Sequence, residues 1–413
     1  MLDGLRVDGE RLRGRLATLA EIGDTGDGGN CRLALTDADK AGRDLVVEWM
    51  EALGLEVRID AIGNVVGRRA GREDLAPVMT GSHIDTVATG GRYDGNLGVL
   101  GGLEVVETLN DADVVTRRPI EVAFFTNEEG ARFSPDMLGS MAYAGGLPLE
   151  EALDRTDPDG AVLGDELDRI GYRGTMPVPG PVPHAFVELH IEQGPVLERR
   201  GHTIGAVTGV QGISWQELTI RGQANHAGTT PMAMRHDAGF AAGAVTQRVR
   251  DLVTEMGGAQ VGTVGVIDVD PGLTNVVARR ARMTVDLRNT DEALLAEAEC
   301  RLADHVREVA EAEGVTVDSR ATARFEPVTF DGRVIELVEA TAQRLGHSVQ
   351  RLPAGAGHDA GLIAGVCPAG MVFTPSHEGI SHNPAEHTDP QDLDAGADVL
   401  LQVLLTLAEE DPP

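Results

Sequence analysis

Lysine, aromatic residues and long apolar segments are scarce in this chain. Lys40 is the only lysine among 413 residues, and aromatic residues make up 3%, so the core must be built from Val, Leu, Ile and Ala. No segment reaches the roughly 18 apolar residues that a membrane-spanning helix needs. The first residues also lack the continuous apolar stretch of a secretion signal. We therefore expect a cytoplasmic protein that has no membrane partner.

Cysteine is also rare. Cys31, Cys300 and Cys367 are isolated from one another, and no CxxC pair occurs. This usage is typical of a reducing compartment and argues against a metal site built from thiolates.

Basic charge is deficient as well. The chain has 66 acidic and 35 basic residues, which give a formal net charge of -31. Such a charge repels nucleic acid and anionic membranes, so we expect neither as a partner. Strong acidity keeps proteins soluble in concentrated salt, and we hypothesise a salt-adapted, halophilic cytoplasm. An ordinary acidic protein is the alternative.

The length is sufficient for two domains, and the pattern of apolar residues predicts an α/β fold. Residues 36–53 have the cap and the apolar spacing of a helix, and residues 76–83 and 120–126 read as buried parallel strands. A further helix is expected at 334–346, a strand at 370–376 and a long final helix from about 389 to 409.

The middle of the chain has a different pattern. Strands are predicted at 214–222, 259–269, 280–289 and 315–325, and helices at 235–256 and 291–314. The order β-α-β-β-α-β is that of a self-contained ferredoxin-like domain. We place this inserted domain at residues 210–326, so that residues 1–209 and 327–413 form the other domain.

Side chains that can bind metal follow several of the predicted strands. Ligands gather at the carboxyl ends of strands in open α/β sheets. The candidates are His83, Asp85 and Asp94; Glu128 and Glu129; Glu188, His190 and Glu192; and His377, Glu378 and His382.

The first group permits two interpretations. His83 and Asp85 are two residues apart, so in an extended segment they face the same side, and the carboxylate can accept the imidazole N–H of a ligating histidine. Asp94 stands just before a predicted helix. The alternative is that His83 is an ordinary core histidine and Asp94 caps that helix.

The other groups add acids and histidines. Glu128 and Glu129 are adjacent and should point in opposite directions, so that one can bind metal while the other acts as general base; an unremarkable exposed turn is the alternative. His190 shares a face with Glu188 and Glu192, and this face would be costly to bury without cations. His382 lies in a loop that contains Gly and Pro. Nitrogen and oxygen ligands suit Zn²⁺, Mn²⁺, Co²⁺ or Ni²⁺ equally.

Six motifs together resemble one known family over nearly the whole chain. They are GSHIDTVATGGRYDGNLGVL, FTNEEGARF, ELHIEQGPVLE, NHAGTTPM, GAGHDA and SHNPAEHT, in this order. This set resembles the M20-type amidohydrolases of the hydantoinase/carbamoylase branch. The resemblance implies a metal-dependent exopeptidase-like catalytic domain with an inserted ferredoxin-like lid that serves in dimerisation.

The resemblance also implies a site with two divalent metal ions per subunit. Asp94 would bridge the ions, His83 and His190 would complete the ligands of one, and Glu129 and His382 those of the other. The general base would be Glu128, and Asp85 would orient His83. Peptidase-like members have a carboxylate at the position of His190, so LHIEQG favours the carbamoyl branch over the peptidases.

Substrate binding is implied for another set of residues. By the same resemblance these are Gln193, His226, Asn275, Arg288, Gly357 and His358. Arg288 would hold a substrate carboxylate bidentately, although pairing with Asp286 on the surface is the alternative. His226 would reach the active site of a neighbouring subunit and stabilise the developing oxyanion, which requires a homodimer.

The expected activity is hydrolysis of N-carbamoyl-L-amino acids to the amino acid, ammonia and carbon dioxide. Allantoate amidohydrolase and β-ureidopropionase are alternatives of the same branch, because their substrates also place a ureido group near a carboxylate. An M20 aminopeptidase or dipeptidase is a more distant alternative. The charge alone would also suit a non-catalytic protein that stores divalent cations.

Overall fold

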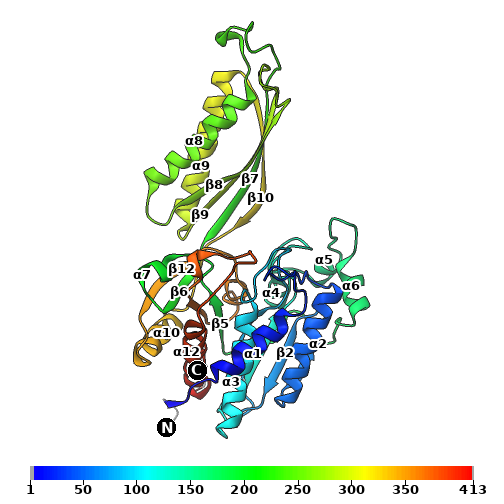
Figure 1. The fold of residues 1–413 in the computed structure, drawn as a ribbon, viewed down its shortest axis with the longest axis vertical. Helices are drawn as coiled ribbons and strands as arrows, with labels where there is room; N and C mark the ends of the chain where they lie inside the picture. Colours follow the sequence, from blue (N-terminus) through cyan, green and yellow to red (C-terminus); the bar gives the residue numbers. More distant parts are fainter. Residues whose placement is uncertain (1–3, 412–413) are drawn as a thin grey trace. The chain divides into compact units, whose positions relative to one another are not determined.

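A computed structural model describes residues 4–411, which fold into two compact units (Figure 1). Unit 1 consists of Met1–Gly209 with Thr329–Pro413, and unit 2 is Val210–Val328. The second unit ends two residues beyond the boundary drawn from the sequence. Within residues 4–411, no helix has both the length and the apolar character needed to cross a membrane.

Unit 1 contains most of the secondary structure. Its helices are α1 (Gly9–Ala20), α2 (Asp37–Ala52), α3 (Asn96–Asp111), α4 (Leu138–Tyr143), α5 (Leu149–Leu153), α6 (Leu163–Ile170), α7 (Val196–Arg200), α10 (Gly332–Arg344), α11 (Asp359–Ile363) and α12 (Pro390–Glu409). Its strands are β1 (Glu56–Ile59), β2 (Val65–Arg69), β3 (Val78–His83), β4 (Ile120–Phe125), β5 (Ala185–Ile191), β6 (Ile204–Val210), β11 (Val328–Thr329), β12 (Val349–Ala354) and β13 (Ala369–Thr374).

These strands form one mixed sheet. The order is β1-β2-β4-β3-β5-β13-β6-β11, and β12 pairs with β6. The four central strands β4, β3, β5 and β13 are parallel, whereas β2 and β6 pair with their neighbours in the antiparallel sense. The carboxyl ends of the parallel strands therefore meet at one edge of the sheet. The predicted α/β fold is confirmed.

Helices α3 and α12 cover one face of the central strands. Both contact β5, and α3 approaches it closely because it carries glycine at the contact. A Cβ atom on Gly98 would lie 2.6 Å from the carbonyl oxygen of Leu189. Glu188 and His190 point to the other face of β5, where the backbone N–H of Ala360 in α11 donates to Glu188.

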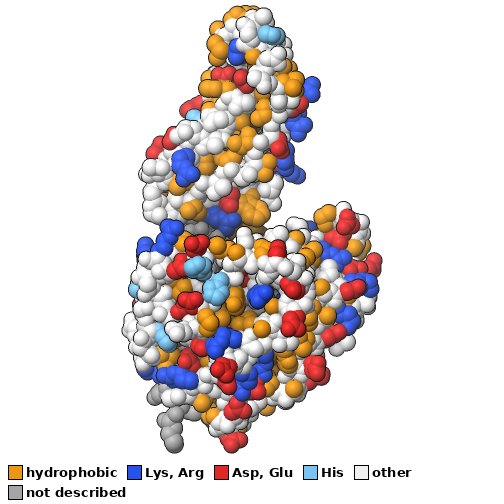
Figure 2. Space-filling model, in the orientation of Figure 1, with side chains coloured by type: hydrophobic (Ala, Val, Ile, Leu, Met, Phe, Trp, Pro, Cys, Tyr) orange, Lys and Arg blue, Asp and Glu red, His pale blue; other side chains and the backbone are white. Residues whose placement is uncertain are grey.

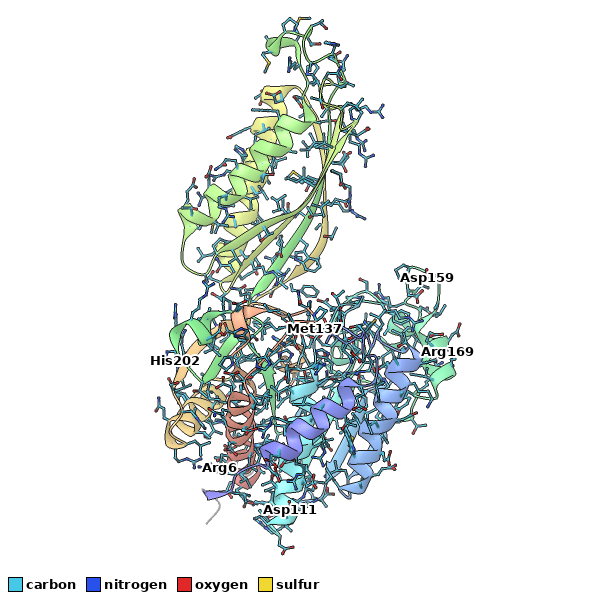
Figure 3. The ribbon with its side chains drawn as sticks, in the orientation of Figure 1. Arg6, Asp111, Met137, Asp159, Arg169 and His202 are labelled. Carbon is cyan, nitrogen blue, oxygen red and sulfur yellow. The ribbon has the colours of Figure 1, made fainter. Side chains whose placement is uncertain are left out.

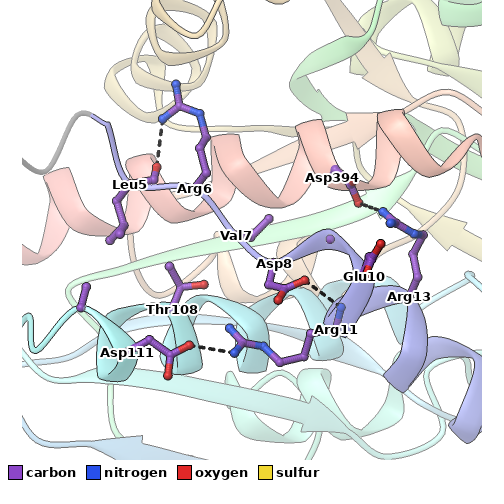
Figure 4. A pocket seen from close by; sticks show the side chains of 12 residues that line it. Leu5, Arg6, Val7, Asp8, Glu10, Arg11, Arg13, Thr108, Asp111 and Asp394 are labelled. Carbon is purple, nitrogen blue, oxygen red and sulfur yellow. Dashed lines mark hydrogen bonds and ion pairs between the residues drawn. The ribbon is translucent and has the colours of Figure 1, made fainter.

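Ion pairs fix the shorter helices to this framework. Arg169 of α6 is labelled in Figure 3. Its guanidinium contacts the Leu35 carbonyl oxygen and the Asp37 carboxylate at the start of α2. In α1, Arg11 pairs with the buried Glu104 of α3 at 2.7 Å and also with Asp111. A groove of about 610 Å³ lies beside α1, where Arg11 pairs with Asp111 and Arg13 pairs with Asp394 (Figure 4).

Unit 2 is built from four strands and two long helices. Its elements are β7 (Gly212–Arg221), α8 (Ala238–Met256), β8 (Val261–Asp270), β9 (Arg280–Asn289), α9 (Glu292–Glu313) and β10 (Thr316–Phe325). The chain order is β-α-β-β-α-β, and the antiparallel sheet has the order β10-β7-β9-β8, as in ferredoxin-like folds.

The two faces of the unit 2 sheet differ in polarity. One face packs on α8 and α9, and strand β9 contributes Ala281, Met283, Val285 and Leu287 to that core. The intervening residues of β9 point to the other face, where Arg282 pairs with Glu217 and Arg288 pairs with Asp286. Strand β8 forms one edge of the sheet.

Candidate metal centre

The five expected ligand residues come from segments that follow or end the parallel strands. His83 is the last residue of β3, and His190 is the penultimate residue of β5. Glu129 follows β4, Asp94 lies in the loop before α3, and His382 lies in the loop after β13. The structure brings all five together.

Asp94 lies at the centre of this arrangement. Its Oδ1 atom is 3.6 Å from Nε2 of His83 and 3.1 Å from Nε2 of His190, and its Oδ2 atom is 3.3 Å from Nε2 of His382. His382 Nε2 is also 3.2 Å from Oε2 of Glu129. Two ligand groups result, His83-Asp94-His190 and Asp94-Glu129-His382, and they share Asp94. A carboxylate that uses one oxygen for each group can bridge two ions.

The loop backbone is shaped to hold Asp94 in this place. Gly95 has a positive φ of 66°, and a Cβ atom on it would lie 2.4 Å from Cε1 of His83. Gly95 is the residue before α3 and makes no side-chain cap, and the Asp94 side chain faces the histidines. The alternative interpretation of Asp94 as a helix cap is therefore wrong.

The chemistry of these residues fits divalent cations. All donor atoms are nitrogen or oxygen, and His83, Asp94 and His190 are buried. Although burial lowers the pKa of His83, the nearby Glu128, Asp94, Asp85 and Glu129 raise it well above the usual value. Hydrogen bonds to Asp94 and Glu129 raise the pKa of His382 to about 10. The carboxylates thus favour positive charge here, which bound cations would supply. Figure 2 shows histidine side chains beside acidic side chains on the surface of unit 1.

Backbone carbonyl groups orient the two buried imidazoles. Nδ1 of His83 is 2.9 Å from the carbonyl oxygen of Asp85, and Nδ1 of His190 is 2.8 Å from that of Ile191. Each contact fixes a ring with Nε2 toward Asp94. Nε2 of His190 also lies 3.2 Å from the backbone nitrogen of Gly95.

Asp85 has a different role from the expected one. Its carboxylate does not accept from His83; it accepts the backbone N–H groups of Glu128 and Glu129 at 3.2 and 3.3 Å. The expectation of a carboxylate–imidazole contact is wrong because β3 ends at His83, so the alternation of side chains does not continue to Asp85. Asp85 instead positions the turn that carries both glutamates.

Glu128 lies beside the ligand groups. Its Oε2 atom is 3.4 Å from Nε2 of His83, and the residue is 7% exposed. Burial raises the pKa of Glu128 well above its usual value; the charge of His83 opposes this shift, and the charges of Asp359 and Glu129 add to it. A carboxylate with this environment can accept a proton from a reacting water and return it.

Gln193 also reaches the centre. Its Nε2 atom donates to Oδ2 of Asp94 at 2.8 Å, and its backbone N–H donates to Ser376. Non-glycine residues with positive φ gather in these loops: Asn127 next to Glu128, Gln193, and His382. Such conformations are uncommon and concentrate at functional sites.

The turn with Gly357 and His358 packs against the same centre. The His358 ring is buried and its centroid lies 4.5 Å from that of His190, and its Nε2 atom has no hydrogen-bond partner among the described residues. A Cβ atom on Gly357 would lie 2.7 Å from Cε of Met137. The Met137 side chain thus packs directly against the backbone of this turn.

Several other candidates from the sequence do not join the ligand groups. Glu192 accepts the backbone N–H groups of Val196 and Leu197 at 2.8 Å each, so its burial needs no cation. His377 pairs with Glu198 at 2.8 Å, and the Glu378 backbone N–H donates to the same carboxylate. Glu188 accepts from Ser82 and Ala360 and lies near His190 and His358.

Three expected substrate-binding residues belong to unit 2. His226 is exposed, and its Nδ1 atom accepts the backbone N–H groups of Gly228 and Thr229. Asn275 is exposed as well. Its segment pairs with the segment of His226 through an isolated β-bridge between His226 and Val276. Arg288 makes the ion pair with Asp286 that the alternative interpretation expected, with Nη2 2.9 Å from Oδ2.

Sequence reasoning missed two residues that touch the centre, Ser381 and Glu386. Ser381 Oγ is 3.1 Å from Oδ2 of Asp94, and Glu386 contacts the backbone of Asp94. Both lie in the SHNPAEHT motif that also carries His382, so the motif itself was the available signal.

Comparisons with known proteins place this chain in a family. The sequence pattern of peptidase family M20/M25/M40 matches residues 79–406. The chain is 44% identical to an N-carbamoyl-L-amino-acid amidohydrolase of Rhizobium meliloti, over 98% of this chain and 97% of the relative. It is 41% identical to an N-carbamoyl-L-amino acid amidohydrolase of Geobacillus stearothermophilus, over 98% and 99%.

A solved structure shares the whole fold. A hydantoinase/carbamoylase family amidase from Burkholderia multivorans superposes with a TM-score of 0.96 at 47% identity, over 98% of this chain and 99% of that one. The protein therefore has the mixed-sheet α/β fold of this class of hydrolases. It belongs to peptidase family M20/M25/M40, and the resemblance drawn from the six motifs is confirmed.

Proposed function

We propose that this protein is an enzyme that hydrolyses the ureido C–N bond of N-carbamoyl-L-amino acids. The observation that carries the proposal is the pair of ligand groups sharing Asp94, with Glu128 at 3.4 Å from His83. The full-length similarity to two N-carbamoyl-L-amino-acid amidohydrolases supports the substrate class. One water is consumed, and the amino acid, ammonia and carbon dioxide are released.

The residues of unit 1 have distinct parts in this reaction. His83, Asp94 and His190 would hold one divalent ion, and Asp94, Glu129 and His382 the other. Bound ions of this kind polarise a carbonyl group and make a water molecule more acidic. Glu128 takes the proton of the attacking water and returns it to the nitrogen that leaves with the amino acid. Zn²⁺, Mn²⁺, Co²⁺ and Ni²⁺ all suit the ligands.

Each unit contributes residues with a proposed part in substrate recognition. Gln193 and the turn of Gly357 and His358 contact the ureido end from unit 1. In unit 2, Arg288 and Asn275 bind the carboxylate, and His226 stabilises the oxygen that becomes negative. Arg288 then exchanges or shares its contact with Asp286 when substrate arrives.

Ammonia release from a panel of substrates tests the proposal. The panel contains N-carbamoyl-L-methionine, N-carbamoyl-β-alanine and allantoate, with a dipeptide assayed by amine release, and each is measured with Mn²⁺, Co²⁺, Ni²⁺ and Zn²⁺ in turn. We expect the highest kcat/KM for the N-carbamoyl-L-amino acid. A preference for allantoate or N-carbamoyl-β-alanine would move the protein within the branch, whereas a preference for the dipeptide would refute the ureido assignment. Many weak metal sites in equilibrium dialysis would instead indicate a cation store.

The partner of this protein is proposed to be a second copy of the chain. Strand β8 is an edge of the unit 2 sheet and exposes Val266, Ile267 and Val269, which are 37%, 46% and 43% exposed. Unprotected apolar edges favour pairing with another strand. We expect a dimer in analytical ultracentrifugation and dissociation in an Ile267→Lys variant. A wild-type monomer with full activity would exclude action of His226 in the neighbouring subunit.

The proposed setting is a cytoplasm of high salt concentration. The net charge of -31 supports this proposal, because counterions at high ionic strength screen repulsion between acidic groups. Thermal stability and activity measured from low to molar salt test it. Full activity and stability at low salt would favour an ordinary acidic protein.

A further inference from the structure

Glu386 is a buried carboxylate to which none of the expected metal-binding, catalytic or substrate-binding roles is assigned. It lies in the loop between β13 and α12, four residues after His382, and is 6% exposed. Burying a carboxylate costs free energy because the group loses its hydration. Buried carboxylates are therefore found where hydrogen bonds from the protein replace the lost water contacts.

The Glu386 carboxylate contacts Asp94 and residues next to the ligands Asp94 and His382. Its Oε1 atom accepts the backbone N–H groups of Tyr93 at 2.9 Å and of Asp94 at 3.2 Å. Its Oε2 atom lies 3.3 Å from Oγ of Ser381, and Ser381 Oγ lies 3.1 Å from Oδ2 of Asp94. The carboxylate thus contacts both the backbone of Asp94 and a hydroxyl that reaches its side chain.

The loop around Asp94 is shaped to receive this carboxylate. A Cβ atom on Gly91 would lie 2.2 Å from Cδ and Oε1 of Glu386, so only glycine permits the approach. Asp94 also has its carbonyl oxygen bonded to the N–H of Asn96 at 2.7 Å. Its peptide groups are therefore fixed on both sides.

We propose that Glu386 is a positioning residue that fixes Asp94 where one carboxylate can serve both ligand groups. Glu386 joins two segments that each carry ligands, residues 91–95 and residues 381–387. Thr89 also donates to the carbonyl oxygen of His382 at 3.2 Å, but among these links only the Glu386 carboxylate accepts the backbone N–H of Asp94 itself. The inference rests on the proposed metal centre, although it does not depend on which ureido compound is hydrolysed.

The structure offers a matched control in Asp157. Its side chain is 6% exposed; its Oδ1 atom accepts the backbone N–H groups of Asp159 and Ala161, and its Oδ2 atom accepts from Arg132. Like Glu386, it accepts two backbone N–H groups with one oxygen, although its second oxygen pairs with an arginine, and the loop after α5 carries none of the ligands. A loss that is specific to Glu386 separates positioning of Asp94 from general loop stability.

The experiment measures the affinity of the full-length protein for Mn²⁺ and Zn²⁺ by competition with a chelator, together with the melting temperature of the metal-free form. We expect Glu386→Ala to lose about 10- to 100-fold in metal affinity, the range typical of groups that orient ligands. Asp157→Ala should keep the wild-type affinity while lowering the metal-free melting temperature by a similar amount. At saturating metal, Glu386→Ala should recover kcat with KM unchanged.

Other results are equally decisive. Equal metal affinities for Glu386→Ala, Asp157→Ala and wild type would overturn the role of Glu386. Absence of tight metal binding by the wild type would refute the proposed metal centre itself, so the two failures are distinguishable. If Glu386→Ala does not fold, Glu386→Gln decides, because it keeps one acceptor oxygen and replaces the other. A threefold or greater loss of affinity in Glu386→Gln supports the proposal, and an unchanged affinity overturns it.

Discussion

The two units hold their candidate functional groups in opposite ways. In unit 1, Asp94 is 3% exposed and is contacted by His83 at the end of β3, His190 near the end of β5 and His382 after β13. In unit 2, His226 and Asn275 are exposed, and Arg288 is held by Asp286, two residues away on the same strand. The Asp94 carboxylate is thus positioned by distant segments and shielded from water, whereas Arg288 pairs with a neighbour on its own strand and lies over the ring of Trp215. We therefore expect proton transfer and metal binding to depend on unit 1 residues, and binding of the substrate carboxylate to depend on Arg288 of unit 2.

The largest effect is expected at Glu128. A Glu128→Gln enzyme keeps the shape of the side chain but cannot accept a proton, so kcat should fall by about 10²- to 10⁴-fold while metal remains bound. Steady-state kinetics and metal content measure both quantities. Glu121→Gln is the matched control, because Glu121 is a buried carboxylate of β4 that pairs with Arg68. A near-normal rate for Glu128→Gln would remove it as the general base.

The next effect concerns the metal ligands. Asp94→Asn replaces one of the two oxygens that face His83, His190 and His382, so we expect metal content to fall from two ions to fewer than one per subunit. A ligand that binds only the folded state stabilises it, so a chelator should lower the melting temperature of the wild type and leave that of Asp94→Asn nearly unchanged. Equal chelator responses in the two proteins would contradict the bridging role.

A smaller effect is expected in unit 2. Arg288→Lys removes the planar fork that binds a carboxylate bidentately, and KM should rise about 10- to 100-fold with kcat changed far less. Arg282→Lys is a close control, since Arg282 lies on the same strand and the same face and pairs with Glu217. Similar KM values for the two variants would favour a purely structural Arg288. A dominant fall in kcat would break the division of roles between the units.

The fold was predictable where it depends on local patterns. Thr36 accepts from the Asp39 backbone and begins α2 as its sequence indicated, and β9 spans Arg280–Asn289 as its alternation indicated. Periodicity is a property of neighbouring residues, so it can be read along the chain. The ferredoxin-like order followed from the sequence of six such elements.

The details of the site were predictable only in part. The motifs indicated which side chains are available, and the five expected ligands lie together. The contacts of Asp85, Glu192 and Glu386 were missed, because side-chain directions beyond a strand end depend on loop dihedral angles. The positive φ values at Asn127, Gln193 and His382 are such angles, and nothing in the local pattern of residues specifies them. Tertiary contacts impose them.

The smallest effect tests whether buried charge in unit 1 matters away from the metal centre. Asp60 is buried in the turn between β1 and β2, and burial raises its pKa from 3.8 to about 7, although N–H groups of Asn64 and Ile62 oppose the shift. Because its pKa is higher in the folded state, the folded protein binds a proton more tightly than the unfolded chain. The stability from Asp60 is therefore complete below about pH 4 and is lost as the pH rises through 7. The slope between these values should be at most about 1.4 kcal/mol per pH unit, and Asp60→Asn should remove it.

Denaturant unfolding from pH 4 to 8 measures this slope, and the exposed Asp318→Asn in unit 2 should leave it unchanged. The slope is the informative quantity, because the new amide nitrogen would face Nδ2 of Asn64 and lower the stability at every pH. An identical slope in wild type and Asp60→Asn would show that Asp60 stays ionised, held by its three hydrogen bonds.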